Sequence, residues 1–141
     1  MSGISLEQSA GIFYKTRVRD VMTSATVTCR PDTLVSEMAL LMKSHSTGSV
    51  VVVDDDGPVG IVTERDLVYK VVATGAGELT AGEIMSSPPV IVHPDDFIYQ
   101  AVGLMMRRRC RRLIVVHEAG GLAGLISMLS LIHISEPTRP Y

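Results

Sequence analysis

Apolar residues in this chain fall into short continuous runs separated by stretches with helical periodicity. Val50 to Val53 and Leu113 to Val116 are unbroken apolar runs rich in β-branched residues, which is typical of strands covered on both faces. An apolar stripe at helical spacing precedes the first run and consists of Leu34, Met38, Leu41 and Met42. The pattern predicts alternating strands and helices rather than an all-helical or all-strand fold.

The first half of the chain reads as strand, helix, strand, turn, strand, helix. We expect strands at 25–29, 49–53 and 59–62, with Asp54-Asp55-Asp56-Gly57-Pro58 as the turn of a hairpin. Asp32 or Thr33 is expected to cap the first helix. The second helix should run from Thr63 to about residue 73, because Gly75 supplies a left-handed stop.

The second half repeats this order. Strands are expected at 90–92, 113–116 and 122–126, and a helix from Asp95 to about Arg109 carries a second apolar stripe. Thr80 and Glu83 have the spacing of a capping box, so a short helical turn should begin there.

Alignment of the chain with itself shows an internal repeat. Val21-Met22-Thr23 matches Ile84-Met85-Ser86, and Pro31-Asp32 matches Pro94-Asp95, both 63 positions later (22 to 85 and 31 to 94). Gly60-Ile61-Val62-Thr63 matches Gly124-Leu125-Ile126-Ser127 after one inserted residue. The repeat predicts two copies of one structural unit.

We interpret the chain as an α/β fold of the α+β kind, built from two tandem β-α-β-β-α repeats packed about a pseudo-twofold axis. Strands without a polar face need covering, and one repeat of about 60 residues is too small to cover its own. The expected organisation is a tail at 1–17, a first repeat at 18–74, a linker at 75–79, a second repeat at 80–128 and a tail at 129–141.

Composition narrows the class of protein. With 141 residues, 46% of them hydrophobic and 20% charged, the chain suits one compact globular domain and excludes two full-sized domains or a disordered chain. A net charge of −2 gives no overall attraction to nucleic acid or membrane. The isolated Cys29 and Cys110 are predicted to be small buried hydrophobes in a reducing compartment, and no leader or membrane span is legible, so we expect a cytoplasmic protein.

Three strings in the sequence resemble the cystathionine-β-synthase (CBS) domain pair, also called a Bateman module. They are Val21-Met22-Thr23, residues 48–54 (GSVVVVD) and above all residues 60–67 (GIVTERDL). The resemblance implies a non-catalytic regulatory module that binds AMP, ADP or ATP in a cleft between the repeats, with no obligatory cofactor. It also implies a homodimer formed through the helices of both repeats and an unknown regulated protein as partner.

The resemblance also implies which residues bind the ligand. Thr63 and Asp66 would face the ribose, the backbone at Val27 and Thr28 would border the adenine, and Arg111 and Arg112 would meet the phosphates. Arg65 and Ser127 complete the expected set, with Ser127 standing where the second repeat carries its copy of Thr63. A carboxylate can accept hydrogen bonds from ribose hydroxyls, and a guanidinium matches phosphate oxygens.

Each of these positions also has a structural interpretation. Thr63 and Asp66 have capping-box spacing, so both could simply close a helix start. The run Arg107 to Arg112 holds five arginines at a helix end, where the helix dipole favours cations. The histidines (His45, His93, His117 and His133) show no metal-ligand spacing, and no acid–base or nucleophile constellation indicates an enzyme.

The C-terminal end departs from the family pattern. The pattern calls for an aspartate at position 130, where this chain has Ser130, so the second site should bind weakly or not at all. Residues 129–139 can be written as an in-frame translation of a sequencing adapter, and we therefore hypothesise that native sequence ends near Met128. Pro137 should limit any helix there to about two turns.

Two other functions fit the same sequence. In the first, the repeats form a ligand-free scaffold for protein assembly and Asp66 serves only as a cap. In the second, the arginines at 107–112 bind nucleic acid, although no aromatic residues interleave them and no groove-reading motif accompanies them.

Overall fold

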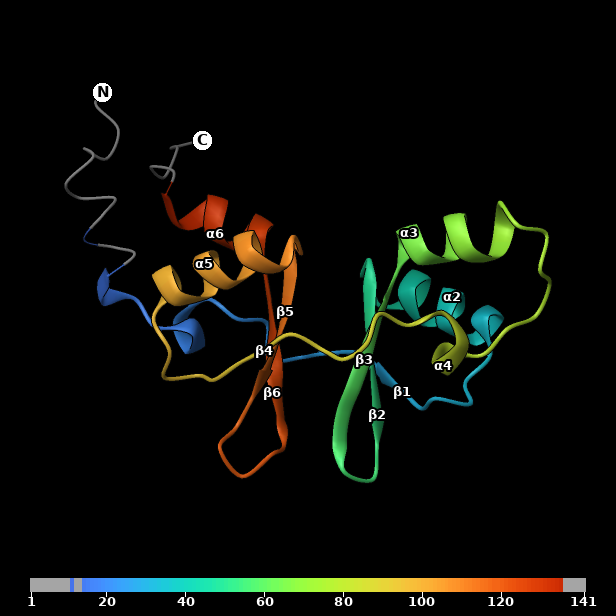
Figure 1. The fold of residues 1–141 in the computed structure, drawn as a ribbon, viewed down its shortest axis with the longest axis horizontal. Coiled ribbons are helices and arrows are strands. Elements are labelled where there is room, and N and C mark those ends of the chain that lie inside the picture. The colour runs from blue at the N-terminus through green and yellow to red at the C-terminus, as the bar shows by residue number, and fades with distance from the viewer. Residues whose placement is uncertain (1–10, 12–13, 136–141) are drawn as a thin grey trace. The chain divides into compact units, whose positions relative to one another are not determined.

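Two compact units make up the protein in the computed structural model, which describes residue 11 and residues 14–135. Unit 1 contains the described residues up to Ser24 and from Val90 onward, and unit 2 contains Ala25–Pro89. Each unit holds one three-stranded sheet with helices packed against it (Figure 1). The α+β class expected from the sequence is therefore confirmed.

Unit 2 follows the strand and helix order that the sequence predicts. Its sheet has the order β1-β2-β3, with β1 parallel to β2 and β2 antiparallel to β3. Asp55 and Asp56 form the turn between β2 and β3. The elements are β1 (Thr28–Cys29), α2 (Val35–Ser44), β2 (Ser49–Asp54), β3 (Gly57–Thr63), α3 (Glu64–Asp66), the π-helical η2 (Leu67–Val72) and α4 (Ala81–Ile84).

Unit 1 has the same sheet. Its order is β4-β5-β6, again with a parallel pair followed by an antiparallel pair. The elements are η1 (Val18–Asp20), β4 (Ile91–Val92), α5 (Ile98–Arg108), β5 (Arg112–Val116), β6 (Leu122–Ser127) and α6 (Met128–Ser135). The two halves of the internal repeat thus form two separate sheets of the same topology.

The apolar runs form the cores. Val50, Val51 and Val52 of β2 are fully buried, and so are Leu113 and Val115 of β5. In each unit the strands pack against methionine and isoleucine or valine side chains from the neighbouring helix, such as Met38 in α2 and Ile98 and Met105 in α5. Burial on this scale is the main stabilising contribution, at about 25 cal/mol per Å² of apolar surface.

Each unit is completed by a segment that the sequence assigns to the other repeat. Val18 of η1 is fully buried in the core of unit 1, beside the strands and α5 of the second repeat. Ala81 and Ile84 of α4 are buried in the core of unit 2, beside the strands and α2 of the first repeat (Figure 1). We call residues 16–23 and 79–86 the exchanged segments.

Backbone hydrogen bonds hold the two exchanged segments in the same way. The Val18 amide donates to Asp96 O, and 63 positions later the Ala81 amide donates to Thr33 O, both at 2.8 Å. Arg19 and Gly82 donate in the same manner to the carbonyls of Pro94 and Pro31. The two exchanged segments therefore make equivalent backbone hydrogen bonds at positions related by the sequence repeat.

A glycine in the third strand of each sheet lies directly under the end of an exchanged segment. Thr23 and Leu125 exchange two backbone hydrogen bonds (2.8 and 3.0 Å) across Gly124, and Ser86 and Ile61 do the same across Gly60. A Cβ atom at Gly124 would lie 2.5 Å from Thr23 O, and one at Gly60 would lie 2.8 Å from Ser86 O. No side chain fits at either position.

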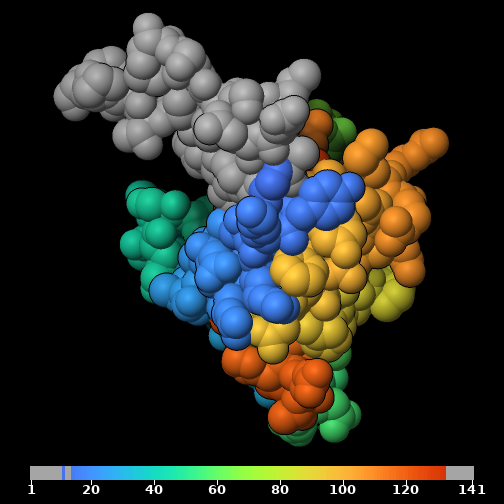
Figure 2. All heavy atoms as spheres, turned by 90° about the vertical axis from the view of Figure 1, so that its left-hand side faces the viewer, coloured from blue at the N-terminus to red at the C-terminus, as the bar shows by residue number. Residues whose placement is uncertain are grey.

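The surface of unit 1 shows the N-terminal described residues packed on the start of α5 (Figure 2). The Arg17 guanidinium lies over the Phe97 ring, 4.4 Å from its centroid, and donates to Asp95 O. A cation over an aromatic face contributes about 0.5–1 kcal/mol at an exposed site. This contact fixes the entry of the first exchanged segment.

Two helix starts differ from the prediction. Helix α2 begins at Val35, its N-cap residue is Leu34, and no side chain caps it, so the predicted cap at Asp32 or Thr33 is wrong. The Thr33 hydroxyl instead accepts from the Arg30 amide and closes a turn. The later helix begins at Ile98 and not at Asp95, because Asp96 uses its carboxylate on the His93 amide in the equivalent turn.

The two cysteines and the C-terminal helix give mixed outcomes. Cys29 is buried as predicted, and burial raises the pKa of its thiol to about 11, partly offset by a hydrogen bond with Thr33. Cys110 is only half-buried, so the prediction of a buried residue is wrong there. Helix α6 spans about two turns and buries Leu131 in the core of unit 1. The hypothesis that native sequence ends near Met128 stays a prediction.

Candidate functional site

Thr63 and Asp66 form a complete capping box at the end of β3. The Asp66 carboxylate accepts from the Thr63 amide (2.9 Å) and from the Thr63 hydroxyl (3.1 Å), both at Oδ2. In return the Asp66 amide donates to Thr63 Oγ1 at 3.3 Å. The structural interpretation of this pair is therefore confirmed, and any ligand role has to share the carboxylate with the cap.

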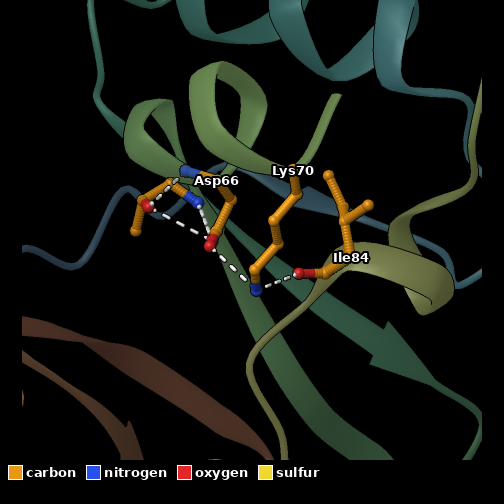
Figure 3. A network of polar contacts seen from close by, with 4 residues as sticks. Asp66, Lys70 and Ile84 are labelled. Atoms are coloured by element: carbon orange, nitrogen blue, oxygen red, sulfur yellow. Dashed lines mark hydrogen bonds and ion pairs between the residues drawn. The ribbon is translucent and has the colours of Figure 1, made fainter. Parts of the chain in front are cut away.

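The second oxygen of Asp66 is held by a lysine that the sequence analysis did not select. Lys70 Nζ lies 3.0 Å from Asp66 Oδ1 and also donates to Ile84 O at 2.8 Å (Figure 3). The Asp66 side chain is 12% exposed and the Lys70 side chain 45% exposed. The carboxylate is thus nearly enclosed, whereas the ammonium is reachable by solvent.

The expected adenine-binding backbone lies at the same end of the sheet as Thr63. Because β1 runs parallel to β2 and β3 runs antiparallel to β2, the start of β1 and the end of β3 lie at the same end of the sheet. Val27, just before β1, accepts from the Val51 amide, and Thr28 is exposed. Two strand spacings, on the order of 10 Å, separate these residues from Thr63. That distance is comparable to the length of a nucleoside.

Arg65 has a different neighbour from the one expected of a ligand residue. Its guanidinium lies over the Tyr69 ring, 4.7 Å from the ring centroid, and both side chains are exposed. The stacking orders the outer face of the helix next to Asp66. A ligand role for Arg65 stays a prediction.

Unit 1 brings Arg111, Arg112 and Ser127 together at the matching edge of its own sheet. Arg112 and Ser127 are register partners at the start of β5 and the end of β6. Ser127 Oγ lies 3.1 Å from Ser130 Oγ and accepts from the Ser130 amide at 3.3 Å. This is the Thr63–Asp66 arrangement with a neutral hydroxyl in place of the carboxylate.

A surface pocket of about 530 Å³ opens at this edge of unit 1. Arg111 is exposed and Arg112 half-buried, and among the residues that the structure describes no carboxylate lies within ion-pair distance of either guanidinium. Apolar groups from α6 form the rest of the wall. The lining residues are Arg111, Arg112, Ser127, Met128, Leu129 and Ile132. Such a pocket suits an anion with an apolar portion.

The described part of the chain offers no other site chemistry of two kinds, a metal cluster and a membrane span. No group of three or more histidine, cysteine, aspartate or glutamate side chains is placed to hold a metal ion. None of the described helices is long and apolar enough to cross a membrane.

A match to a known protein family identifies the family to which the chain belongs. The CBS domain model matches twice, at residues 18–73 and 81–136, which together make up well over half of the chain. The chain belongs to the CBS domain family. The repeats detected in the sequence are therefore the two members of a CBS pair.

Two curated relatives of this CBS pair have related sequences. MK0525 of Methanopyrus kandleri is 40% identical over 119 residues, and the alignment covers 82% of this chain and 58% of that protein. The CBS domain-containing protein YhcV of Bacillus subtilis is 32% identical over 112 residues, covering 79% of each chain. The CBS pair also matches 34% of the length of a probable arabinose 5-phosphate isomerase from Haemophilus influenzae.

Solved structures show the same CBS-pair fold. The CBS-domain protein ATU1752 of Agrobacterium tumefaciens has a TM-score of 0.74 at 34% identity, and the match covers 84% of this chain and 92% of that one. CBSX2 in complex with AMP has a TM-score of 0.69 at 25% identity, covering 84% and 94%. PAE2072 of Pyrobaculum aerophilum, complexed with AMP, matches with a TM-score of 0.74 at 24% identity, covering 82% and 89%.

Several residues at the two candidate sites were not predicted from the sequence. Lys70 stands four positions after Asp66, a spacing that places two helical side chains on one face, so the ion pair could have been predicted from the sequence. The apolar wall of the unit 1 pocket depends on how α6 lies against β6, which no local pattern specifies. The predicted cleft between the repeats stays a prediction.

Proposed function

We propose that this chain is a non-catalytic regulatory module that binds an adenosine nucleotide such as AMP, ADP or ATP. The observation that carries the proposal is the nearly enclosed Asp66 carboxylate just after the end of β3, at the same end of the sheet as Val27 and Thr28 at the start of β1. The bound AMP in the related CBSX2 structure supports the same ligand class.

The proposed adenosine residues are all in unit 2. The Asp66 carboxylate would accept from a ribose hydroxyl, since a carboxylate offers about four acceptor positions. Thr63 would orient Asp66 through the cap, and the backbone of Val27 and Thr28 would border the base. Arg65, stacked on Tyr69, would line the outer side.

The proposed phosphate residues are in unit 1. Arg111 and Arg112 carry two positive charges that no described carboxylate neutralises, and they stand beside the Ser127 hydroxyl in the pocket. Planar guanidinium groups bind phosphate oxygens through paired hydrogen bonds. Because Ser130 supplies no carboxylate, this pocket would favour a phosphate over a ribose.

We also propose that the module acts as a homodimer. Large apolar side chains remain exposed on α2 and η2 of unit 2 and on α5 and α6 of unit 1, and they are Leu40, Val68, Val72, Met106, Leu129 and Ile132. Apolar side chains exposed on a helix are candidates for an association surface. A second copy that covers these helices would give a bound nucleotide a partner whose arrangement it can shift.

A ligand-free scaffold is the second candidate. It is favoured by the capping box, because the Thr63 and Lys70 donors already occupy most of the Asp66 acceptor positions. In that case the same helices would mediate assembly without any nucleotide.

Titration separates the two candidates. Purified protein is titrated with AMP, ATP and adenosine while the heat of binding and the midpoint of thermal unfolding are followed. At a ligand concentration 100 times the dissociation constant, binding stabilises the fold by about 2.7 kcal/mol. A nucleotide-binding protein should therefore show a clear rise in the unfolding midpoint. Absence of heat and of a shift with all three compounds supports the scaffold.

The arginine pair predicts a difference between charged and neutral ligands. Replacing Arg111 and Arg112 together with glutamine should weaken AMP binding at the unit 1 pocket about tenfold or more, because hydrogen bonds to charged groups contribute about 1.5–3 kcal/mol each. Adenosine, which has no phosphate, should bind within about twofold of the unchanged protein. Arg107→Gln/Arg108→Gln, two exposed arginines at the end of α5 outside the pocket, is the matched control. Equal losses for AMP and adenosine would exclude the phosphate role.

A further inference from the structure

Lys70 connects the proposed ribose carboxylate to the end of α4. Its ammonium bonds to Asp66 Oδ1 on one side and to Ile84 O on the other, as Figure 3 shows. All three residues belong to unit 2. The inference drawn below rests on the proposed function, because it concerns what happens when a ribose reaches Asp66.

The Asp66 carboxylate has too few vacant acceptor positions for a ribose diol. Two carboxylate oxygens offer about four positions in all. Thr63 fills both positions on Oδ2 with its amide and its hydroxyl, and Lys70 fills one on Oδ1. One position remains, whereas the two ribose hydroxyls present two donors. A diol that binds in bidentate fashion must therefore displace an existing donor.

Lys70 is the donor that leaves at the least free-energy cost. The Thr63 amide is fixed by the backbone at the helix start, and the Thr63 hydroxyl is held by a second bond from the Asp66 amide. The Lys70 side chain is 45% exposed, so its ammonium can be hydrated as it leaves. Its departure leaves the helix start intact, whereas displacing a Thr63 donor breaks the capping box, which costs about 0.5–2 kcal/mol.

We propose that Lys70 is a positioning residue that transmits ribose binding from Asp66 to the C-terminal end of α4. When the diol takes Oδ1, the ammonium withdraws and Ile84 O loses its donor. At the same end of α4 the Met85 amide donates to Ala81 O at 2.8 Å. Helix α4 has only four residues, so loss of its terminal contact loosens the last turn.

The loosened turn leads directly into the last residues of the exchanged segment, which pair with β3. Met85 and Ser86 follow Ile84, and Ser86 exchanges two backbone hydrogen bonds with Ile61 across Gly60. Ser86 thus pairs with β3 three residues before unit 2 ends at Pro89. Ribose binding at Asp66 thereby changes the contacts of residues 84–86 through the Lys70 side chain.

Amide hydrogen exchange at Met85 tests the connection, with adenosine as the probe and 2′,3′-dideoxyadenosine as the ligand that lacks both hydroxyls. In the unchanged protein, saturating adenosine should raise exchange at Met85 about two- to fivefold, the range expected for loss of the Lys70–Ile84 O hydrogen bond at a net contribution of about 0.5–1 kcal/mol. Dideoxyadenosine should leave it unchanged. In Lys70→Met, exchange should already be raised without ligand and should not respond to adenosine.

Affinity gives a second readout that a merely structural role would not move. Removing the competing donor in Lys70→Met should tighten adenosine binding about two- to fivefold, which corresponds to a net hydrogen-bond contribution of about 0.5–1 kcal/mol. Lys70→Arg, which keeps a cation, should restore the original affinity and the Met85 response. Lys43→Met removes an exposed lysine of α2 in the same unit and should behave like the unchanged protein.

The outcomes distinguish the two claims. If adenosine and AMP do not bind the unchanged protein at all, the proposed function and this inference both fail. If adenosine binds but Met85 exchange does not change, or if Lys70→Met still responds, the inference alone is overturned. Weaker adenosine binding by Lys70→Met at an unchanged unfolding midpoint also overturns it, because Lys70 would then be a ligand contact.

Discussion

Replacement of Gly124 with alanine should lower the free energy of unfolding by about 3 kcal/mol or more. The added Cβ would lie 2.5 Å from Thr23 O and 3.3 Å from Met22 Sδ. A backbone oxygen cannot rotate away, so Thr23 must shift and both of its hydrogen bonds to Leu125 are strained or lost. Each of these bonds contributes about 1 kcal/mol, and the clash adds to their loss.

Gly121→Ala is the matched control for this prediction. Gly121 precedes the same strand, and nothing lies within 4 Å of a Cβ built there. Its replacement should change the free energy of unfolding by less than about 0.5 kcal/mol. Denaturant unfolding followed by circular dichroism measures both variants, and equal midpoints would show that the exchanged segment does not need the glycine.

Replacement of Asp66 with alanine should weaken AMP and adenosine binding about 10- to 100-fold. A hydrogen bond to a charged group contributes about 1.5–3 kcal/mol, and this carboxylate is the proposed ribose acceptor. The same change removes one half of the capping box, which costs about 1 kcal/mol of stability. Calorimetric titration measures the affinity, and thermal unfolding without ligand measures the stability.

Glu83→Ala separates the loss of a cap from the loss of a ligand contact. Glu83 closes the capping box of α4 by accepting from the Thr80 amide and hydroxyl, which is the same role that Asp66 has for Thr63. It should therefore lose a similar amount of stability while nucleotide affinity stays within about twofold. If the two variants lose affinity equally, Asp66 acts as a cap and the scaffold interpretation is preferred.

Features encoded by neighbouring residues could be predicted from the sequence. The capping boxes at Thr63 and Thr80, the hairpin turn at Asp55-Asp56 and the buried valines of β2 each depend on a few adjacent positions. The internal repeat predicted two equal sheets, because equal patterns fold alike. The family resemblance added the expected ligand class, which the local patterns alone did not specify.

Features that depend on distant residues were missed. The pattern around Asp32 and Thr33 allows a cap, but these residues lie in a turn whose carbonyls are used by the exchanged segment, at Ala81 and Gly82. The bond from Lys70 to Ile84 O likewise depends on the placement of α4 against unit 2. Sequence spacing specifies neighbours along one helix and does not specify which later segment packs on it.

The exchanged segments also constrain how such a duplicated gene can change. Because residues 16–23 complete one core and residues 79–86 complete the other, deletion of either copy would leave the surviving sheet with an uncovered apolar edge. Either repeat made on its own would therefore lack the segment that fills its core, and an apolar gap would remain where the other repeat's segment lies.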